Sequence, residues 1–174
     1  MNDLPVSKRL RIRKVTYADL DVMVTWLNNP RVLAFYEEPP SELDRVTRKY
    51  GPRIDGKHYV TPCIIEYDDV PIGYLQYYKM QADALKSLDY PSPGNQLLYG
   101  IDQFIGEPAL WGKGIGTEMI RMTLSYLEKQ GVSKVLLDVK KSNGRAIRSY
   151  EKCGFTPAKE LDTETILMEW TSHN

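Results

Sequence analysis

The sequence predicts a single domain of the α+β class, in which mixed α/β layers pack around one central sheet. The chain has 174 residues, a length that suits a single domain with one hydrophobic core. A chain of this length buries roughly 70% of its unfolded surface on folding. Strand-like and helix-like patterns follow one another in the order β-α-α-β-β-β-α-β-α-β, which is typical of layered α+β domains. No internal repeat or low-complexity tract interrupts residues 1–174, so we expect one domain.

The first half of the chain predicts a strand, two helices and a hairpin. Leu10 and Ile12 alternate with basic residues as a strand does, and Thr16-Tyr-Ala-Asp19 is a capping box that opens a helix ending at Asn28-Asn29-Pro30. Ser41-Glu-Leu-Asp44 is a second capping signature, which predicts a helix after Pro39-Pro40. Two β-rich runs, 59–67 and 71–80, join at Asp68-Asp69 and predict a hairpin.

The second half begins with a long polar stretch, 81–96, that predicts a loop; loops of this length in compact domains are usually functional or mobile. The expected elements that follow are a strand over 97–105, a glycine-rich turn, a helix over 115–130, a strand over 134–139, a helix over 143–153 closed by Gly154, and a strand over 165–170.

Composition excludes several classes of protein. Lys+Arg and Asp+Glu both number 23, so the chain lacks the basic footprint that nucleic acids require. The longest apolar run, Val32 to Tyr36, is far shorter than the about 20 residues that span a bilayer, and the N-terminus has no apolar signal core. We therefore expect a cytoplasmic protein that binds neither membrane nor nucleic acid, as a monomer or homodimer.

Few residues are available for metal or triad chemistry. The histidines are His58 and His173, and Cys63 and Cys153 form no CxxC pair. A histidine zinc site or a Ser-His-Asp triad would depend on one residue. We expect no metal and two reduced, buried thiols.

The motif Trp111-Gly-Lys-Gly-Ile-Gly-Thr117 stands between an expected strand and an expected helix. Alternating glycines let the backbone turn sharply and present N–H groups at a helix N-terminus, where an anion such as a pyrophosphate is favoured. A tight turn without a ligand explains the glycines equally well. The motif is neither a Walker loop nor a GxGxxG fingerprint.

A second motif, Asn143-Gly-Arg-Ala-Ile-Arg-Ser-Tyr-Glu-Lys-Cys-Gly-Phe155, reads as a helix capped by Asn143 and closed by Gly154. Taken alone, Tyr150 would be a core residue with a satisfied hydroxyl. Together the two motifs resemble the GNAT superfamily of acetyl-CoA-dependent N-acetyltransferases. The resemblance implies a central mixed sheet with splayed parallel strands, flanked by helices, that holds acetyl-CoA.

The resemblance also implies roles for individual residues. The glycine turn would bind the CoA pyrophosphate through backbone amides, Asn143 would contact the pantetheine arm, and Tyr150 would protonate the leaving thiolate. The residues of the turn are Gly112, Lys113, Gly114, Gly116 and Thr117. Trp111 departs from the family pattern, which has Arg or Gln at the position that opens the turn.

A narrower resemblance lies in Tyr99-Gly-Ile-Asp-Gln-Phe-Ile-Gly-Glu-Pro108, which is similar to the Gly-[Ile/Met]-Asp-Gln segment of aminoglycoside 6′-N-acetyltransferases. It implies that Asp102 lies at the substrate amine, where we expect it to act as a base directly or through a water. We expect a backbone N–H on the strand that carries Asp102 to be the oxyanion donor. It further implies that Asp138 and Asp89 contact the ammonium groups of the drug. Other matching segments contribute Trp26, Tyr36 and Gln76 as substrate-binding candidates.

Physical chemistry favours a polycationic substrate independently. Glu37, Glu38, Glu42 and Asp44 cluster without a base among them, which suits either ammonium binding or the N-terminal turn of a helix. Tyr74, Gln76 and Tyr78 share one strand face, a polar pattern unusual for a core. We expect acetyl transfer to the 6′-amine of aminoglycosides, the antibiotic-resistance reaction. The alternatives are a GNAT enzyme for another small amine or a peptide N-terminus, and a non-catalytic acyl-CoA binding protein.

Overall fold

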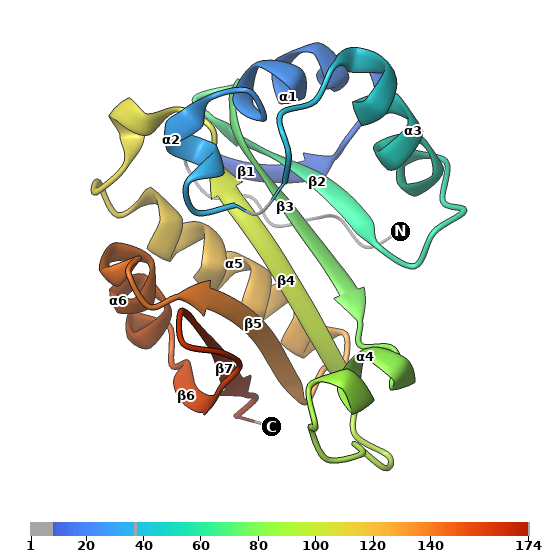
Figure 1. Cartoon of the computed structure of the whole chain (residues 1–174), viewed down its shortest axis with the longest axis vertical. Coiled ribbons are helices and arrows are strands. Elements are labelled where there is room, and N and C mark those ends of the chain that lie inside the picture. The colour runs from blue at the N-terminus through green and yellow to red at the C-terminus, as the bar shows by residue number, and fades with distance from the viewer. Residues whose placement is uncertain (1–8, 37, 174) are drawn as a thin grey trace.

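The computed structural model describes residues 9–36 and 38–173, and within them one mixed sheet of seven strands forms the centre of the molecule (Figure 1). The strand order is β1-β2-β3-β4-β5-β7-β6. The strands are β1 (Leu10–Lys14), β2 (Thr61–Tyr67), β3 (Val70–Lys79), β4 (Leu98–Ile105), β5 (Lys134–Lys140), β6 (Thr156–Glu160) and β7 (Thr165–Thr171). The helices are α1 (Leu20–Trp26), α2 (Pro30–Leu33), α3 (Leu43–Ile54), α4 (Ala82–Ser87), α5 (Ile115–Lys129) and α6 (Gly144–Lys152). Short 3₁₀ turns, Tyr17–Asp19 and Pro108–Leu110, precede α1 and the glycine turn.

The predicted α+β class is confirmed, and the long predicted elements lie where the patterns indicated. The Thr16–Asp19 capping box forms, since the Asp19 carboxylate accepts the Thr16 backbone N–H at 2.8 Å. The second capping signature is displaced by one residue: Glu42, and not Ser41, is the N-cap of α3, because the Ser41 hydroxyl donates to the Pro39 carbonyl instead.

Three elements were not predicted. α2 has four residues; Asn29 is its N-cap and Pro30 takes its first helical position. The Asn-Pro pair that was expected only to end the preceding helix therefore also starts α2. α4 interrupts the stretch expected to be a loop. β6 contains Pro157 and pairs with β7 at the edge of the sheet, the position in a sheet where proline is tolerated.

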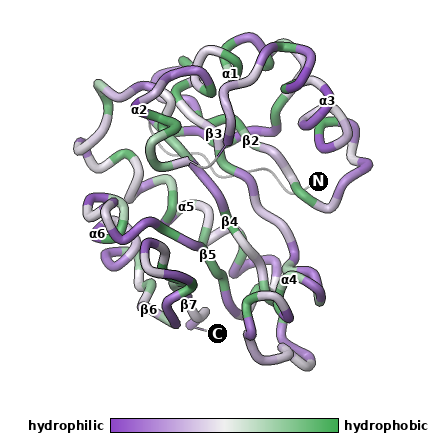
Figure 2. Tube along the Cα trace, in the orientation of Figure 1, coloured by the Kyte–Doolittle hydropathy of each residue, from purple (hydrophilic) through white to green (hydrophobic). Residues whose placement is uncertain are grey.

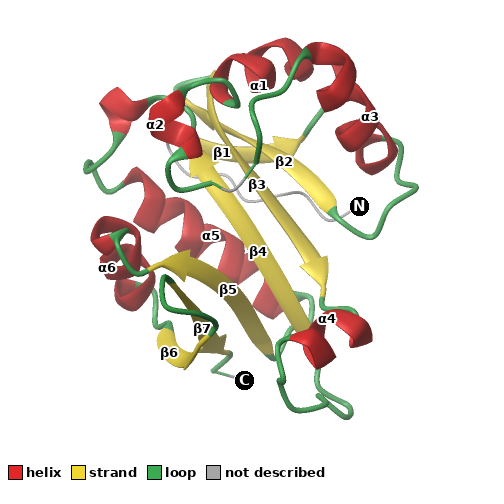
Figure 3. Cartoon of the chain, in the orientation of Figure 1, coloured by secondary structure: helices red, strands yellow, loops and turns green. Residues whose placement is uncertain are grey.

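Two large apolar cores lie on opposite faces of the sheet, and a third, smaller cluster packs Leu85 of α4 against Leu98 and Leu136. α5 packs Met119, Ile120, Leu124 and Leu127 onto one face, where β4 and β5 contribute Ile101 and Leu137. On the other face α1 and α3 pack around Trp26, Tyr50, Tyr74 and Phe104. Figure 3 shows the helices on both sides of the strands, and in Figure 2 the α6 tube is mostly hydrophilic. Because side chains alternate along a strand and helices cover both faces of the sheet, consecutive β4 residues face different helix layers.

No helix within residues 9–36 and 38–173 combines the length and the hydropathy that a bilayer span requires. Both cysteines are free thiols: Cys63 is buried, as expected, whereas Cys153 is half-buried. Over the same described residues, no three His, Cys, Asp or Glu side chains gather in a way that could hold a metal ion.

Candidate active site

The sheet opens between β4 and β5, its one parallel pair among the described strands. The two strands pair only over Leu98–Gly100 and Lys134–Leu136. Beyond that point β4 stays paired with β3 as far as Ile105, while β5 stays paired with β7 as far as Lys140. Figure 1 shows the two strands diverging toward α2 and α6. The expected splay is confirmed, and a cavity of about 670 Å³ occupies the opening and extends between α5 and α6.

The glycine turn forms one wall of this cavity. Gly112 and Gly114 have φ values of 76° and 82°, a left-handed conformation that strains any residue with a Cβ. Gly114 is the N-cap of α5 and supplies no side-chain cap, so the N–H groups of the first helical turn point outward without intrahelical partners. These donors at the positive end of a fifteen-residue helix fit the negative charge of a pyrophosphate.

Within the predicted cradle, one residue stands apart. Gly112, Gly114, Gly116 and Thr117 line the cavity, whereas the Lys113 side chain is exposed and does not. A contribution of Lys113 would therefore come from its backbone.

Basic side chains of α6 add charge to the same end of the cavity. Arg145, Arg148 and Lys152 all line it. Their spacing of three and four residues places them on one helix face. This spacing is visible in the sequence and could have predicted a basic helix face beside the glycine turn. Together with the α5 N-terminus they make this end electropositive, which suits a polyphosphate.

Trp111 organises two of the arginines. Its indole Nε1 donates to the Ile105 carbonyl at 2.9 Å, which ties the turn to the end of β4. The Arg145 and Arg31 guanidinium carbons lie 4.6 Å and 5.2 Å from the Trp111 ring centroid, within the range of cation–π contact. Trp111 is uncharged, but its ring holds one arginine from α6 and one from α2 at the glycine turn.

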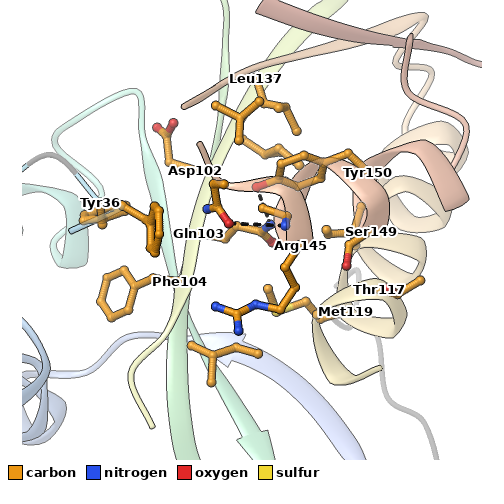
Figure 4. A pocket seen from close by; sticks show the side chains of 18 of the residues that line it. Tyr36, Asp102, Gln103, Phe104, Thr117, Met119, Leu137, Arg145, Ser149 and Tyr150 are labelled. Carbon is orange, nitrogen blue, oxygen red and sulfur yellow. Dashed lines mark hydrogen bonds between the residues drawn. The ribbon is translucent and has the colours of Figure 1, made fainter. Parts of the chain in front are cut away.

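Tyr150 of α6 is buried beneath the opening, with 7% of its surface exposed. Its hydroxyl accepts a hydrogen bond of 2.9 Å from Gln103 Nε2 (Figure 4). The pKa of Tyr150 is raised to about 12, mainly because the phenol is buried. The phenol is therefore protonated at neutral pH. Because the hydroxyl oxygen accepts from Gln103, its proton can be donated elsewhere.

Asn143 also lines the cavity, next to the start of α6. Its side-chain oxygen accepts the Ala146 N–H at 3.3 Å, the cap that the sequence predicts.

Asp102 stands on the opposite face of β4 from Gln103. Gln76, its cross-strand neighbour on β3, donates from Nε2 to Asp102 Oδ2 at 2.7 Å. Asp138 extends from β5 on the same side of the sheet, and both carboxylates border the main cavity. They also border a second cavity of about 360 Å³ beneath α4. The carboxylates therefore stand where the two cavities meet.

The second cavity has a mixed lining. Aromatic and aliphatic side chains predominate, and the charged groups are Asp102, Asp138 and Arg53; its other walls include Tyr59, Tyr78, Met80, Leu88 and Leu161. Tyr36, on the chain after α2, lines the main cavity and packs edge-on against Phe104, with ring centroids 4.7 Å apart (Figure 4).

Two predicted substrate contacts are not brought to these cavities. Trp26 is 1% exposed, and its indole donates to Glu107 Oε1 at 3.1 Å. A Cβ added at Gly106 would lie 2.2 Å from the Trp26 ring. Trp26 thus supports the end of β4 from within the core. Asp89 is exposed after α4 and lines neither cavity. The prediction of Trp26 as a direct substrate contact is therefore wrong, whereas the contact of Asp89 stays a prediction that neither cavity supports.

The acidic cluster divides between roles. Glu42 occupies the N-cap position of α3, without a side-chain capping hydrogen bond, and Asp44 lies in the first turn, as the helix-entry interpretation predicts. The Glu38 side chain is 5% exposed, forms an ion pair with Lys49, and accepts from the Tyr50 hydroxyl at 3.1 Å. Glu38 is thereby committed to holding α3. Glu37 lies outside the described residues.

Comparisons with known proteins agree with this geometry. A GNAT acetyltransferase domain matches residues 16–163. The chain is 35% identical over 149 residues to the aminoglycoside N(6′)-acetyltransferase type 1 of Klebsiella pneumoniae, covering 83% of this chain and 72% of that protein. The solved structure of AAC(6′)-Ib with ribostamycin and coenzyme A superposes with a TM-score of 0.80 at 29% identity, covering 94% of both chains. A spermidine N-acetyltransferase from Vibrio cholerae shares the fold, with a TM-score of 0.77 at 19% identity over 95% of this chain and 96% of that one.

A sheet opened between parallel strands, with an anion cradle on one face and carboxylates on the other, defines an acyltransferase that uses an acyl-CoA donor. The chain belongs to the GNAT acetyltransferase family.

Proposed function

We propose that this enzyme transfers the acetyl group of acetyl-CoA to the 6′-amine of aminoglycosides. The observation that carries the proposal is the placement of Asp102 and Tyr150 on opposite faces of β4 beside one opening in the sheet. A proton acceptor and a proton donor thus flank the place where an amine and a thioester could meet. The likeness to aminoglycoside N(6′)-acetyltransferase over most of the chain supports the drug as substrate.

The donor fits the electropositive end of the cavity. The α5 N-terminus would hold the diphosphate, with Arg145 and Arg148 beside it, and Asn143 would border the pantetheine arm. Acetyl-CoA would supply the acetyl group as a thioester. On the other face, Asp102 and Asp138 supply the negative charge that an ammonium-bearing sugar requires.

Each catalytic side chain has one proton to move. Asp102 takes the proton that the substrate ammonium must lose before its nitrogen can attack the acetyl carbonyl carbon. When the carbon–sulfur bond breaks, Tyr150 donates its phenolic proton to the sulfur, and the attacking nitrogen releases its second proton as the amide forms. Tyr150 then regains a proton from solvent and Asp102 releases its proton to solvent, so that one proton is released per turnover. The retention of both groups disfavours a non-catalytic acyl-CoA binding protein.

Thiol release distinguishes the drug from other amines. We expect release of coenzyme A with kanamycin and tobramycin at rates at least about tenfold above those with spermidine or a peptide N-terminus. A rigid aminoglycoside whose ammonium groups fit both Asp102 and Asp138 would need an advantage of only about 1.4 kcal/mol over a flexible or singly charged amine. Faster turnover with spermidine or the peptide would overturn the aminoglycoside proposal and keep the family.

Acetyl-CoA is expected to raise the melting temperature of the protein. At about a hundred times its dissociation constant a ligand stabilises the folded state by about 2.7 kcal/mol, which corresponds to about 5 °C or more for a chain of this size. Gly114→Val should abolish the shift by straining the cradle. Gly94→Val is the matched control, because Gly94 also has a positive φ of 60° but lies outside both cavities. An equal shift in parent and Gly114→Val would contradict the cradle.

Neutralising Asp138 is expected to weaken drug binding and leave acetyl-CoA binding unchanged. Asp138→Asn should raise the KM for kanamycin about tenfold, the scale of one charge-assisted contact. The parent KM should also rise between about 0.05 M and 0.5 M salt, since screening weakens exposed charge pairs. Asp21 is an exposed carboxylate on α1, and Asp21→Asn, the matched control, should change neither the KM for kanamycin nor its dependence on salt. A parent KM insensitive to salt would argue against recognition by carboxylates.

We also propose that the enzyme acts in the cytoplasm, where Cys63 and Cys153 would remain the free thiols they are in the structure.

A further inference from the structure

We propose that Arg53, at the C-terminal end of α3, is a positioning residue for the base Asp102 and acts through Gln76. The proposal rests on the proposed function, because it assumes that Asp102 accepts the substrate proton. Arg53 is remote from both sequence motifs, and its part in the site appears only when α3 is folded against β3.

Three short hydrogen bonds connect the residues. Arg53 Nη1 and the Tyr74 hydroxyl both donate to Gln76 Oε1 at 2.7 Å. Gln76 Nε2 then donates to Asp102 Oδ2, also at 2.7 Å. Gln76 is 8% exposed and lies directly across from Asp102 in the β3–β4 register. The two donors together occupy the acceptor capacity of the amide oxygen.

Arg53 decides which way the Gln76 amide points. A tyrosine hydroxyl can donate or accept, so Tyr74 would tolerate either end of the amide. A guanidinium can only donate, so the end that faces Arg53 must be the oxygen. The amide nitrogen is consequently turned toward Asp102, where it stabilises an ionised carboxylate. Without Arg53 the amide could rotate and present its oxygen to the carboxylate, which would repel it.

Arg53 has few structural contacts to explain its presence otherwise. Its guanidinium lies over the Tyr50 ring, 5.3 Å from the centroid. It forms no salt bridge with any carboxylate in the described part of the chain. Its Nε is buried and has no hydrogen-bond partner there, an arrangement that folding alone disfavours. Arg53 lines the second cavity beside Asp102, so its charge is directed to the site.

Gln76→Glu tests the arrangement most sharply. A glutamate keeps acceptor oxygens for Arg53 and Tyr74 but has no donor for Asp102, so the two carboxylates repel each other. We expect kcat to fall by about a hundredfold or more, while pairing of the new carboxylate with Arg53 offsets most of its repulsion from Asp102, so that the melting temperature falls by only a few degrees. Loss of melting temperature in proportion to activity would show a packing role and overturn the proposal.

Variants of Arg53 test whether it acts through Asp102. Arg53→Met should lower kcat about tenfold and leave the KM for acetyl-CoA unchanged, while Arg53→Lys, which also only donates, should recover part of the rate. Arg48→Met, an exposed arginine on the same helix, should retain the parental rate. The loss from Arg53→Met should vanish in an Asp102→Asn background and persist in full in a Tyr150→Phe background.

The backgrounds separate this inference from the proposed function. If Asp102→Asn alone keeps the parental kcat, the base assignment fails and the inference fails with it. If Asp102→Asn is slow but Arg53→Met is as fast as the parent, or lowers kcat equally in both backgrounds, the role of Arg53 is contradicted while the proposed function stands.

Discussion

Asp102→Asn is expected to lower kcat by about a hundredfold or more, the scale on which a positioned general base contributes. Asparagine keeps the shape of the side chain and an oxygen that can accept from Gln76 Nε2. It cannot take a proton from the substrate ammonium. The KM for acetyl-CoA should stay near the parental value, because the cradle lies at the other end of the cavity. Steady-state kinetics with both substrates varied measures the two effects separately.

Raising the pH should partly restore the Asp102→Asn variant, since the free-amine fraction of the substrate grows and less deprotonation is needed. A variant with near-parental kcat at neutral pH would exclude Asp102 as the base. Asp138 would then be the next candidate, because it borders the same junction of cavities. Glu107, another carboxylate near the end of β4, is a less suitable base, since its Oε1 already accepts a hydrogen bond from the Trp26 indole.

Tyr150→Phe is expected to slow turnover by about tenfold to a thousandfold, as loss of a positioned acid does. The ring remains packed beside Phe155, with centroids 5.8 Å apart, so the fold should persist. The variant leaves Gln103 Nε2 without its partner, which costs about 1–3 kcal/mol of stability. The deficit in rate should shrink with an acetyl thioester of a more acidic thiol, because a better leaving group needs less protonation.

The pH dependence of Tyr150 has a definite sign. Its folded pKa of about 12 lies above the ordinary value of 10.0, so the neutral phenol is favoured and the proton remains available through the neutral range. Stability from this group is complete below pH 10 or so and is lost as the pH rises toward 12. The parental kcat should show no Tyr150-dependent decline between about pH 7 and 10. A decline there that Tyr150→Phe removes would contradict the assignment.

Local patterns predicted the parts of the fold that are governed by local physics. The capping box at Thr16, the helix over α5 and the cap of α6 at Asn143 depend on residues within one turn of each other. α2 and β6 were not predicted from the sequence because each is short. In addition, β6 is stabilised by pairing with β7 and not by its own residue pattern.

The site was predictable to the extent that the motifs carry it. The glycine turn, Tyr150 and Asp102 were found from sequence and border one cavity. The partners that hold them were not: Gln103 lies 47 residues from Tyr150 along the chain, and Arg53 lies 23 from Gln76. Such contacts are set by how helices pack on the sheet. The same holds for Trp26, which the family resemblance suggested as a substrate contact but which packs in the core.

The position of the acetyl group on kanamycin shows directly whether the enzyme acetylates the 6′-amine with Asp102 as the base. The enzyme would be incubated with acetyl-CoA and kanamycin, and the product analysed by two-dimensional NMR, with Asp102→Asn as the matched control. We expect one new acetamide, on the 6′-nitrogen, formed by the parent and about a hundredfold more slowly or not at all by the variant. Acetylation at another amine, or a 6′-acetyl product formed equally fast by Asp102→Asn, would contradict it.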